Sequence, residues 1–149
     1  MQVTIRECRE SDLPLVLPLY AQLGMDDGRV LTVEKARAIF RRLQSYPDYK
    51  LFVATITGEI LGVFAMLIMD NLGHQGAPSA LVEDVVVRAD RRRRGLGREM
   101  IRFAMNRARE KGCYKLALSS HKNREEAHRF YENLGFQRHG YSFLVELTP

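Results

Sequence analysis

The chain has 149 residues, the size of one folded domain, and its 46% hydrophobic and 28% charged residues are typical of a globular protein. No apolar run reaches the roughly 20 residues that a membrane-spanning helix needs, so we expect no membrane association. The 23 lysines and arginines against 18 aspartates and glutamates leave a net charge of +5, which suits an anionic ligand or a nucleic acid without deciding between them.

Strand and helix patterns alternate over the first third of the chain. Residues 2–7 alternate between polar and apolar side chains and predict a first strand. Ser11 predicts the N-cap of a first helix, in which Pro18 is expected to cause a kink. Thr32 predicts the cap of a second helix, which ends before Pro47.

Three β-rich runs follow the two helices, at residues 50–56, 59–69 and 81–88. Thr57 and Gly58 separate the first two runs and predict a hairpin turn. Apolar side chains then recur at every third or fourth position over residues 96–111, which is the period of an amphipathic helix. Gly112 is the natural end of that helix.

The last third of the chain predicts a strand, a short helix and a final strand, at residues 113–120, 124–134 and 141–147. The complete order, β α α β β β α β α β, includes one parallel crossover unit around the helix of residues 96–111. No repeat or linker interrupts it, so we expect a single domain over residues 1–149. The expected fold class is α/β (α+β): a mixed, mostly antiparallel twisted sheet with a central parallel β-α-β unit and helices on both faces.

A run of arginines lies between the strand of residues 81–88 and the helix that starts at Leu96. A strand that leads through a glycine turn into a helix directs backbone N–H groups and the positive helix end at one point, which is a binding geometry for phosphate. Gly95 and Gly97 let the main chain approach a ligand closely. Additional positive charge comes from Arg92, Arg93, Arg94 and Arg98. The sequence therefore predicts a pocket for a diphosphate.

Two other interpretations of the arginine run stay open at this point. Such a run is often a solvated charged face, or a patch that binds nucleic acid. Neither interpretation needs the strand before the run or the two glycines after it, so this context favours the phosphate pocket. The turn is neither GxxxxGK[ST] nor GxGxxG, because Arg98, Glu99 and Met100 follow Gly97.

With these motifs the chain resembles the GNAT superfamily of acyl-CoA-dependent N-acetyltransferases. That superfamily has a hydrophobic strand followed by [RQ]-x-x-G-x-[GA] at a helix start, and Arg92–Gly97 fits this motif after the strand. A second family motif, A-x-x-x-Y-x-x-x-G-F, is similar to Ala127–Phe136. The order of elements also agrees from end to end, so the resemblance covers the whole chain. It implies an enzyme that moves an acetyl group from acetyl-CoA to a primary amine.

The resemblance implies that the diphosphate of acetyl-CoA lies on the arginine turn. The pantetheine arm is then expected to run along the preceding strand and to pair with main-chain groups that a splayed neighbouring strand leaves free. The implied acetyl-CoA ligands are Val85, Val86, Val87, Arg92, Arg93, Arg94, Gly95, Leu96, Gly97, Arg98, Asn123, Arg124 and Tyr131. Many members carry an asparagine seven residues before the tyrosine; here that position is Arg124, and Asn123 lies one residue earlier. Members are often dimers, so a homodimer is also implied.

Glu83 and Tyr131 are the implied catalytic residues. An alkyl ammonium must lose a proton before it attacks, and family members use a carboxylate on this strand, which favours Glu83 as the base. The equal alternative is that Glu83 only binds the ammonium. Asp84 follows it, and strand side chains alternate between faces, so we expect only one of the two in the cleft. Tyr131 has the family position of a phenol near the sulfur and is expected to protonate the thiolate, in a direct transfer without an acyl-enzyme.

The acceptor pocket is implied near the meeting point of the first two helices. The expected substrate-binding residues are Tyr20, Met25, Asp84 and His74. Residues 122–131 are similar to the aminoalkylphosphonate acetyltransferase branch, whereas residues 82–87 and 112–115 are similar to glucosamine-6-phosphate acetyltransferases. Both branches act on small amines that carry a phosphorus oxyanion, so the resemblance implies a small, anionic amine metabolite.

Three other functions remain as alternatives. An acetyltransferase for protein N-termini or lysines would need an open groove, and a non-catalytic acyl-CoA sensor would not need Glu83 and Tyr131. A basic nucleic-acid-binding module is disfavoured, because the chain has no tryptophan and its arginines gather in one turn. No HxxxH, HExxH or CxxC spacing occurs, so we expect no metal site. With two cysteines, Cys8 and Cys113, and no secretion signal, we expect a cytoplasmic protein.

Overall fold

The structure, a computed structural model, describes residues 2–147 and has two compact units, one up to Ala117 and one from Leu118 onward. The strands of the first unit are β1 (Val3–Glu7), β2 (Tyr49–Ile56), β3 (Glu59–Met69), β4 (Ser79–Val87) and β5 (Leu116–Ala117). Its helices are α1 (Leu13–Tyr20), α2 (Val33–Leu43) and α3 (Leu96–Glu110), with short 3₁₀ turns between elements. The second unit contains α4 (Glu125–Asn133). The expectation of one domain over residues 1–149 stays a prediction.

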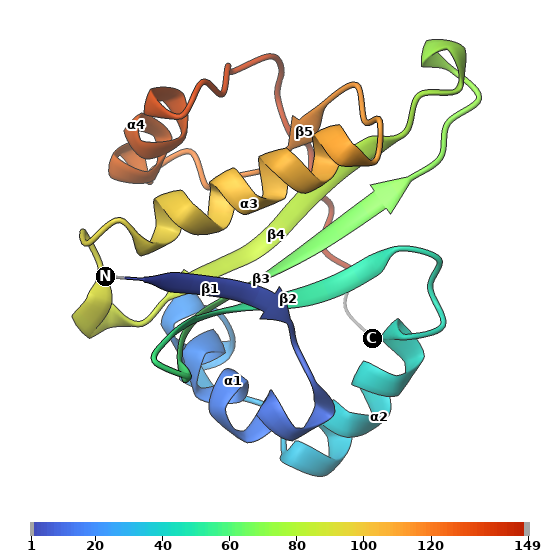
Figure 1. Ribbon diagram of the computed structural model, residues 1–149. Helices are drawn as coiled ribbons and strands as arrows, with labels where there is room; N and C mark the ends of the chain where they lie inside the picture. Colours follow the sequence, from blue (N-terminus) through green and yellow to red (C-terminus); the bar gives the residue numbers. More distant parts are fainter. Residues whose placement is uncertain (1, 148–149) are drawn as a thin grey trace. The chain divides into compact units, whose positions relative to one another are not determined.

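The strands of the first unit form one sheet in the order β1-β2-β3-β4-β5 (Figure 1). β1 to β4 pair antiparallel with their neighbours, and only β4 and β5 pair in parallel. The chain reaches β5 from β4 through α3, which is the crossover connection that a parallel pair requires. The predicted mixed sheet with one parallel β-α-β unit is confirmed.

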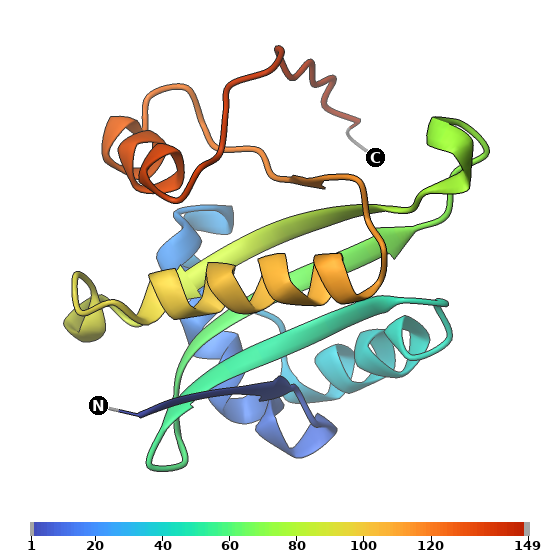
Figure 2. The same cartoon turned by 45° about the horizontal axis from the view of Figure 1, so that its top comes forward.

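Helices cover both faces of this sheet, with α1 and α2 on one face and α3 on the other (Figures 1 and 2). The side chains buried between the sheet and the first two helices include Val16, Leu17, Phe40, Val53, Val63 and Val86. On the other face, the ring of Phe103 from α3 packs on Phe52 of β2, with 5.0 Å between ring centroids. Burial of apolar side chains on both faces stabilises the sheet, and the predicted fold class is confirmed.

The two predicted helix caps have different outcomes. Thr32 caps α2 as expected, because its Oγ1 accepts a hydrogen bond of 3.3 Å from the backbone N–H of Lys35. The prediction that Ser11 caps the first helix is wrong. Ser11 lies inside a 3₁₀ turn, and α1 begins at Leu13 after Asp12. The Asp12 carboxylate accepts a hydrogen bond of 2.7 Å from the backbone N–H of Arg9 and so closes the turn that precedes α1. The N-cap residue of α1 is thus Asp12, one residue after the predicted Ser11.

The two strands predicted near the C-terminus are the main departures from expectation. The run of residues 113–120 is a strand only at Leu116–Ala117, and residues 141–147 form no strand. Tyr141 and Phe143 are each 93% exposed. An alternating sequence becomes a strand only when a neighbouring strand supplies the hydrogen-bond partners, and the pattern of one segment does not contain that information.

Candidate active site

β4 is interrupted by a bulge in its middle. Ala65 of β3 pairs with Glu83, but the next pair joins Val63 to Val86, so β4 has one residue more than β3 in between. Asp84 lies in this bulge with a φ of +51°, in the left-handed region that few side chains other than those of asparagine and aspartate adopt. A bulge changes the direction of side chains and ends regular pairing, and bulges are frequent beside active sites.

The bulge changes the outcome for the two carboxylates. The expectation that Glu83 and Asp84 lie on opposite faces assumed regular alternation, which does not hold here. Both side chains are exposed, and the negative charges of both raise the pKa of Tyr49, after the larger effect of burial. The bulge thus interrupts the regular alternation that the expectation assumed, and which of the two carboxylates enters the cleft stays a prediction.

β4 loses its partner on the β5 side before it reaches the bulge. The two strands pair only at Ala80 with Leu116 and at Leu81 with Ala117. Beyond these pairs, β5 has ended, and the main-chain groups of Val85 to Val87 that point away from β3 have no strand partner within residues 2–147. This is the opening at which an extended chain can pair with β4 by main-chain hydrogen bonds.

The connection from β4 to α3, Arg88–Gly95, has the geometry expected of an anion-binding turn. Arg93 has a φ of +62° and Gly95 a φ of +84°, so two residues of this short turn adopt the left-handed conformation. Left-handed residues within a turn can direct neighbouring N–H groups toward one concave point. Leu96, only 2% exposed, anchors the first turn of α3, and a Cβ added to Gly95 would meet no atom of the protein within 4 Å. The front of the turn is therefore open to a ligand.

The arginines of this turn have two different roles. Arg88 is fixed, because it binds Asp90 at 2.6 Å and Glu59 at 2.7 Å. These ion pairs neutralise the acidic residue of the turn and attach the end of β4 to the start of β3. Within the described residues, Arg94 and Arg98 make no ion pair or side-chain hydrogen bond, and both are exposed. The turn therefore offers two uncompensated cations next to the free N–H groups of a helix start, which fits a diphosphate.

The expected acceptor residues are only partly brought together. Tyr20 ends α1, which contacts β4, and burial followed by the charge of Asp84 raises the pKa of Tyr20. Met25 lies in the exposed connection between α1 and α2. His74 stacks on Tyr114 with 4.0 Å between ring centroids, in the loop before the first residue of β4. His74 therefore belongs to the other end of β4 from the anion turn, away from the bulge.

In the second unit, Tyr131 lies on α4 within an aromatic cluster. Its ring centroid is 5.1 Å from that of Phe130 and 5.7 Å from that of Phe136. Burial raises the pKa of Tyr131, and the nearby Arg124 opposes this shift only in part. The phenol therefore keeps its proton at neutral pH and is available as a hydrogen-bond donor.

The start of α4 is organised by histidines. The backbone N–H of Asn123 donates to Nδ1 of His121 at 3.2 Å, and the ring of His128 bonds to the His121 carbonyl at 2.8 Å. Arg124 has the N-cap position without capping the helix, since a guanidinium has no acceptor atom. Its charge is thus placed beside the free N–H groups of the helix start.

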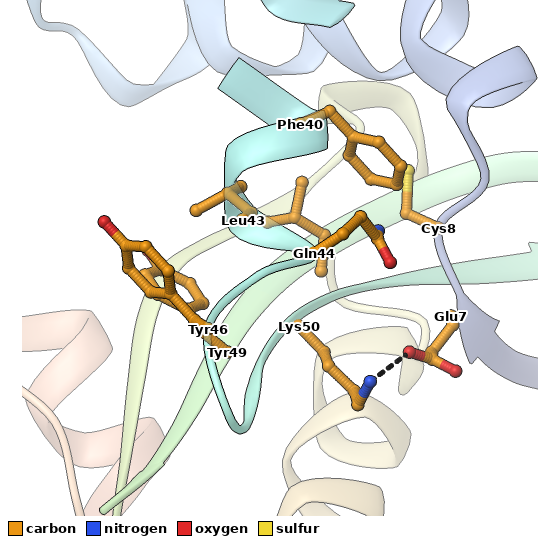
Figure 3. A pocket seen from close by; sticks show the side chains of 9 residues that line it. Glu7, Cys8, Phe40, Leu43, Gln44, Tyr46, Tyr49 and Lys50 are labelled. Atoms are coloured by element: carbon orange, nitrogen blue, oxygen red, sulfur yellow. Dashed lines mark ion pairs between the residues drawn. The ribbon is translucent and has the colours of Figure 1, made fainter. Parts of the chain in front are cut away.

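A separate pocket between α2, β1 and β2 contains Cys8 (Figure 3). An ion pair of 3.0 Å between Lys50 and Glu7 crosses its edge. Burial raises the pKa of Cys8 to about 12 and also raises the pKa of Cys113, so both thiols stay protonated and neither is a nucleophile at neutral pH. Among residues 2–147 no three metal-binding side chains gather, and no helix is long and apolar enough to cross a membrane.

Comparison with known proteins places these features in one family. Residues 18–136 match the profile described as the Acetyltransferase (GNAT) family. Glucosamine 6-phosphate N-acetyltransferase of Trypanosoma brucei brucei is 32% identical over 99% of this chain and 97% of its own length. Aminoalkylphosphonate N-acetyltransferase of Salmonella typhimurium is 26% identical over 68% of this chain and 65% of its own. The crystal structure of glucosamine-6-phosphate N-acetyltransferase from Arabidopsis thaliana superimposes with a TM-score of 0.86, at 25% identity over 99% of this chain and all of that one.

Proposed function

The chain belongs to the GNAT family of acetyltransferases, and we propose that it moves the acetyl group of acetyl-CoA to the primary amine of a small, anionic metabolite in the cytoplasm. The observation that carries this proposal is the sequence of features along β4. An acidic bulge at Glu83, an unpaired edge at Val85–Val87 and an anion turn ending at Gly97 follow one another within fifteen residues. These are the three parts that an amine, a pantetheine arm and a diphosphate need, in that order.

Acetyl-CoA would bind mainly through the main chain of the first unit. The N–H groups at Gly95–Arg98 and the guanidinium groups of Arg94 and Arg98 would hold the diphosphate. The pantetheine amides would pair with the free edge at Val85–Val87. The N–H of Val85 would then polarise the thioester carbonyl, as an oxyanion hole does. Asn123 and Arg124 at the start of α4 would add contacts to the nucleotide end.

The reaction itself needs one proton acceptor and one proton donor. The neutral amine attacks the thioester carbonyl carbon, the new C–N bond forms, and the C–S bond breaks with its electron pair on sulfur. Glu83 takes the proton that the amine nitrogen loses, and Tyr131 gives a proton to the thiolate. The remaining rate enhancement comes from holding amine and thioester together. No covalent intermediate with the protein is required.

The acceptor class follows from the relatives named above, which act on amines with a phosphate or phosphonate group. The test is a thiol-release screen with acetyl-CoA and a panel of amines: glucosamine 6-phosphate, 2-aminoethylphosphonate, glucosamine, a polyamine and a peptide with a free N-terminus. We expect saturable turnover with one of the first two amines. Turnover of the peptide alone would replace the small-molecule proposal with a protein acetyltransferase. Calorimetric binding of duplex DNA without binding of acetyl-CoA would contradict the enzyme proposal.

Tyr131→Phe tests the proton donor. The ring and its aromatic contacts remain, so we expect kcat to fall about tenfold to 100-fold while the Kd for acetyl-CoA, measured by calorimetry, stays the same. Because burial raises the pKa of Tyr131, donation by the wild-type enzyme should persist above the pH at which a solvent-exposed tyrosine ionises. An unchanged kcat in the variant would remove this role.

We also propose that two copies associate through the C-terminal segment Tyr141–Leu147. The exposed apolar side chains of this segment are Tyr141, Phe143, Leu144, Val145 and Leu147, each between 77% and 93% exposed. A monomer rarely leaves such a contiguous apolar surface in water. Light scattering on the 17.1 kDa chain should give a mass of twice that value. Phe143→Asp should lower the measured mass toward that of the monomer. Leu72→Asp is the control, since Leu72 is also fully exposed but lies in another loop, and it should leave the mass unchanged. A monomeric wild type would overturn the proposal.

A further inference from the structure

A tyrosine at the start of β2 faces the carboxylates of the bulge, on the side of the sheet that α1 and α2 cover. Tyr49 pairs with Leu67 of β3, and two residues along β2, Leu51 pairs with Ala65. Ala65 pairs in turn with Glu83 on β4. Side chains two residues apart on a strand share a face, so Tyr49 and Glu83 lie on one face with β3 between them.

The residue between them is small. Ala65, the β3 residue opposite Glu83, has only a methyl group, whereas Leu67 lies opposite Tyr49, so the low part of this face of β3 is on the Glu83 side. Tyr46, in the turn between α2 and β2, packs on the ring of Tyr49, with 5.8 Å between ring centroids, and the two rings lie together in Figure 3. Tyr20 approaches the bulge from α1, which contacts β4 directly. Phenols from two elements, α1 and β2, thus lie on the side of the sheet that Glu83 faces.

Electrostatics agree with this geometry. Burial and then the charge of Asp84 raise the pKa of Tyr20. Burial, then Glu83 and Asp84, raise the pKa of Tyr49. Both phenols therefore remain neutral O–H donors, and neither makes a hydrogen bond to any residue that the structure describes. A half-buried hydroxyl without a partner next to a reaction site is a group that a substrate can satisfy.

We propose that Tyr49 is a specificity-determining residue of the acceptor site. Together with Tyr20 it donates hydrogen bonds to hydroxyl oxygens next to the acceptor's amine, while Glu83 and Asp84 bind the ammonium group. This site favours a hydroxylated amine, such as an amino sugar, over a simple alkylamine. The inference rests on the proposed function and narrows its substrate class. A site built to bind a hydroxyl group discriminates strongly against an analogue without one, because its polar groups are then left unpaired.

The experiment compares two acceptors that share an amine and a phosphorus oxyanion and differ in hydroxyl groups. For Tyr49→Phe we expect kcat/KM for glucosamine 6-phosphate to fall about tenfold, while that for 2-aminoethylphosphonate and the KM for acetyl-CoA stay within twofold. Tyr114→Phe is the matched control, because it also removes a phenol hydroxyl, but from a ring that stacks on His74 near the start of β4, away from the bulge. It should change none of these constants. An equal loss for both acceptors, or no loss, would overturn the inference.

A second measurement keeps this inference separate from the proposed function. The chain has six tyrosines and no tryptophan, so tyrosine emission reports on ligands that touch these rings. Glucosamine 6-phosphate should change the emission of the wild type and of Tyr114→Phe, and the change should shrink in Tyr49→Phe. The absence of any change in the wild type would refute the role of Tyr49, whatever the turnover. Amine binding without acetyl-CoA binding would contradict only the proposed transfer reaction.

Discussion

β4 carries two regions of opposite charge that are built in opposite ways. The anion turn at its end is formed by one continuous segment, with glycine geometry, free N–H groups and exposed arginines supplied by Arg88–Arg98. The acidic bulge in its middle has two carboxylates of its own, but its surroundings come from α1 and β2. The difference indicates a division of labour. In the proposed function, a diphosphate common to all acyl-CoA donors would be bound by local backbone, whereas the variable acceptor would be selected by side chains from distant segments.

The strongest test of this division is Glu83→Gln. It removes the proposed base and keeps the size of the side chain, so we expect kcat to fall about 10³-fold with no change in the Kd for acetyl-CoA. The pH dependence is the control: the rise of kcat/KM with pH that a carboxylate base produces should disappear in the variant. If kcat changes less than threefold, Glu83 only binds the ammonium and the bulge contains no base.

The opposite perturbation, at the anion turn, is Gly97→Asp. Aspartate in the first turn of a helix favours the fold, so the variant should stay folded. Its charge should repel the diphosphate by ~3 kcal/mol at about 6 Å and an effective dielectric constant of about 20, which weakens acetyl-CoA binding about 100-fold. Gly97→Asn controls for size. A calorimetric Kd that is unchanged in Gly97→Asp would show that the diphosphate lies elsewhere.

The two regions also differ in how far the sequence predicts them. Arg92–Gly97 was recognisable because every part of the turn is local: a β-branched strand, two glycines and a helix start. Tyr49 carries no such signal, because its relation to Glu83 depends on strand register and on the small side chain of Ala65. The sequence did not predict the bulge at Asp84 for the same reason. A sequence pattern shows alternation, but it does not show where two residues of one strand lie opposite one residue of its partner. Long-range pairing is the part that one sequence does not reveal.

A milder perturbation of the turn is Arg94→Ala. Arg94 is one of several positive groups at the diphosphate, so we expect the Kd for acetyl-CoA to rise about tenfold, without a change in the KM of the amine. Added salt should reduce the difference between variant and wild type, because the lost interaction is screened. A variant that weakens amine binding as much as acetyl-CoA binding would mean that the two regions of β4 are not separate sites.

The smallest expected effect concerns the stability of the bulge itself. Asp84 has a left-handed φ, which glycine adopts freely but alanine adopts only at a cost in free energy. Asp84→Ala should therefore be less stable than Asp84→Gly by about 1 kcal/mol in urea denaturation. Val85 has no positive φ, and there the order should reverse, with Val85→Gly less stable than Val85→Ala. The reversal between neighbouring positions is the signature of the bulge. If glycine is the less stable replacement at both positions, β4 is regular in solution, and the two carboxylates would then lie on opposite faces.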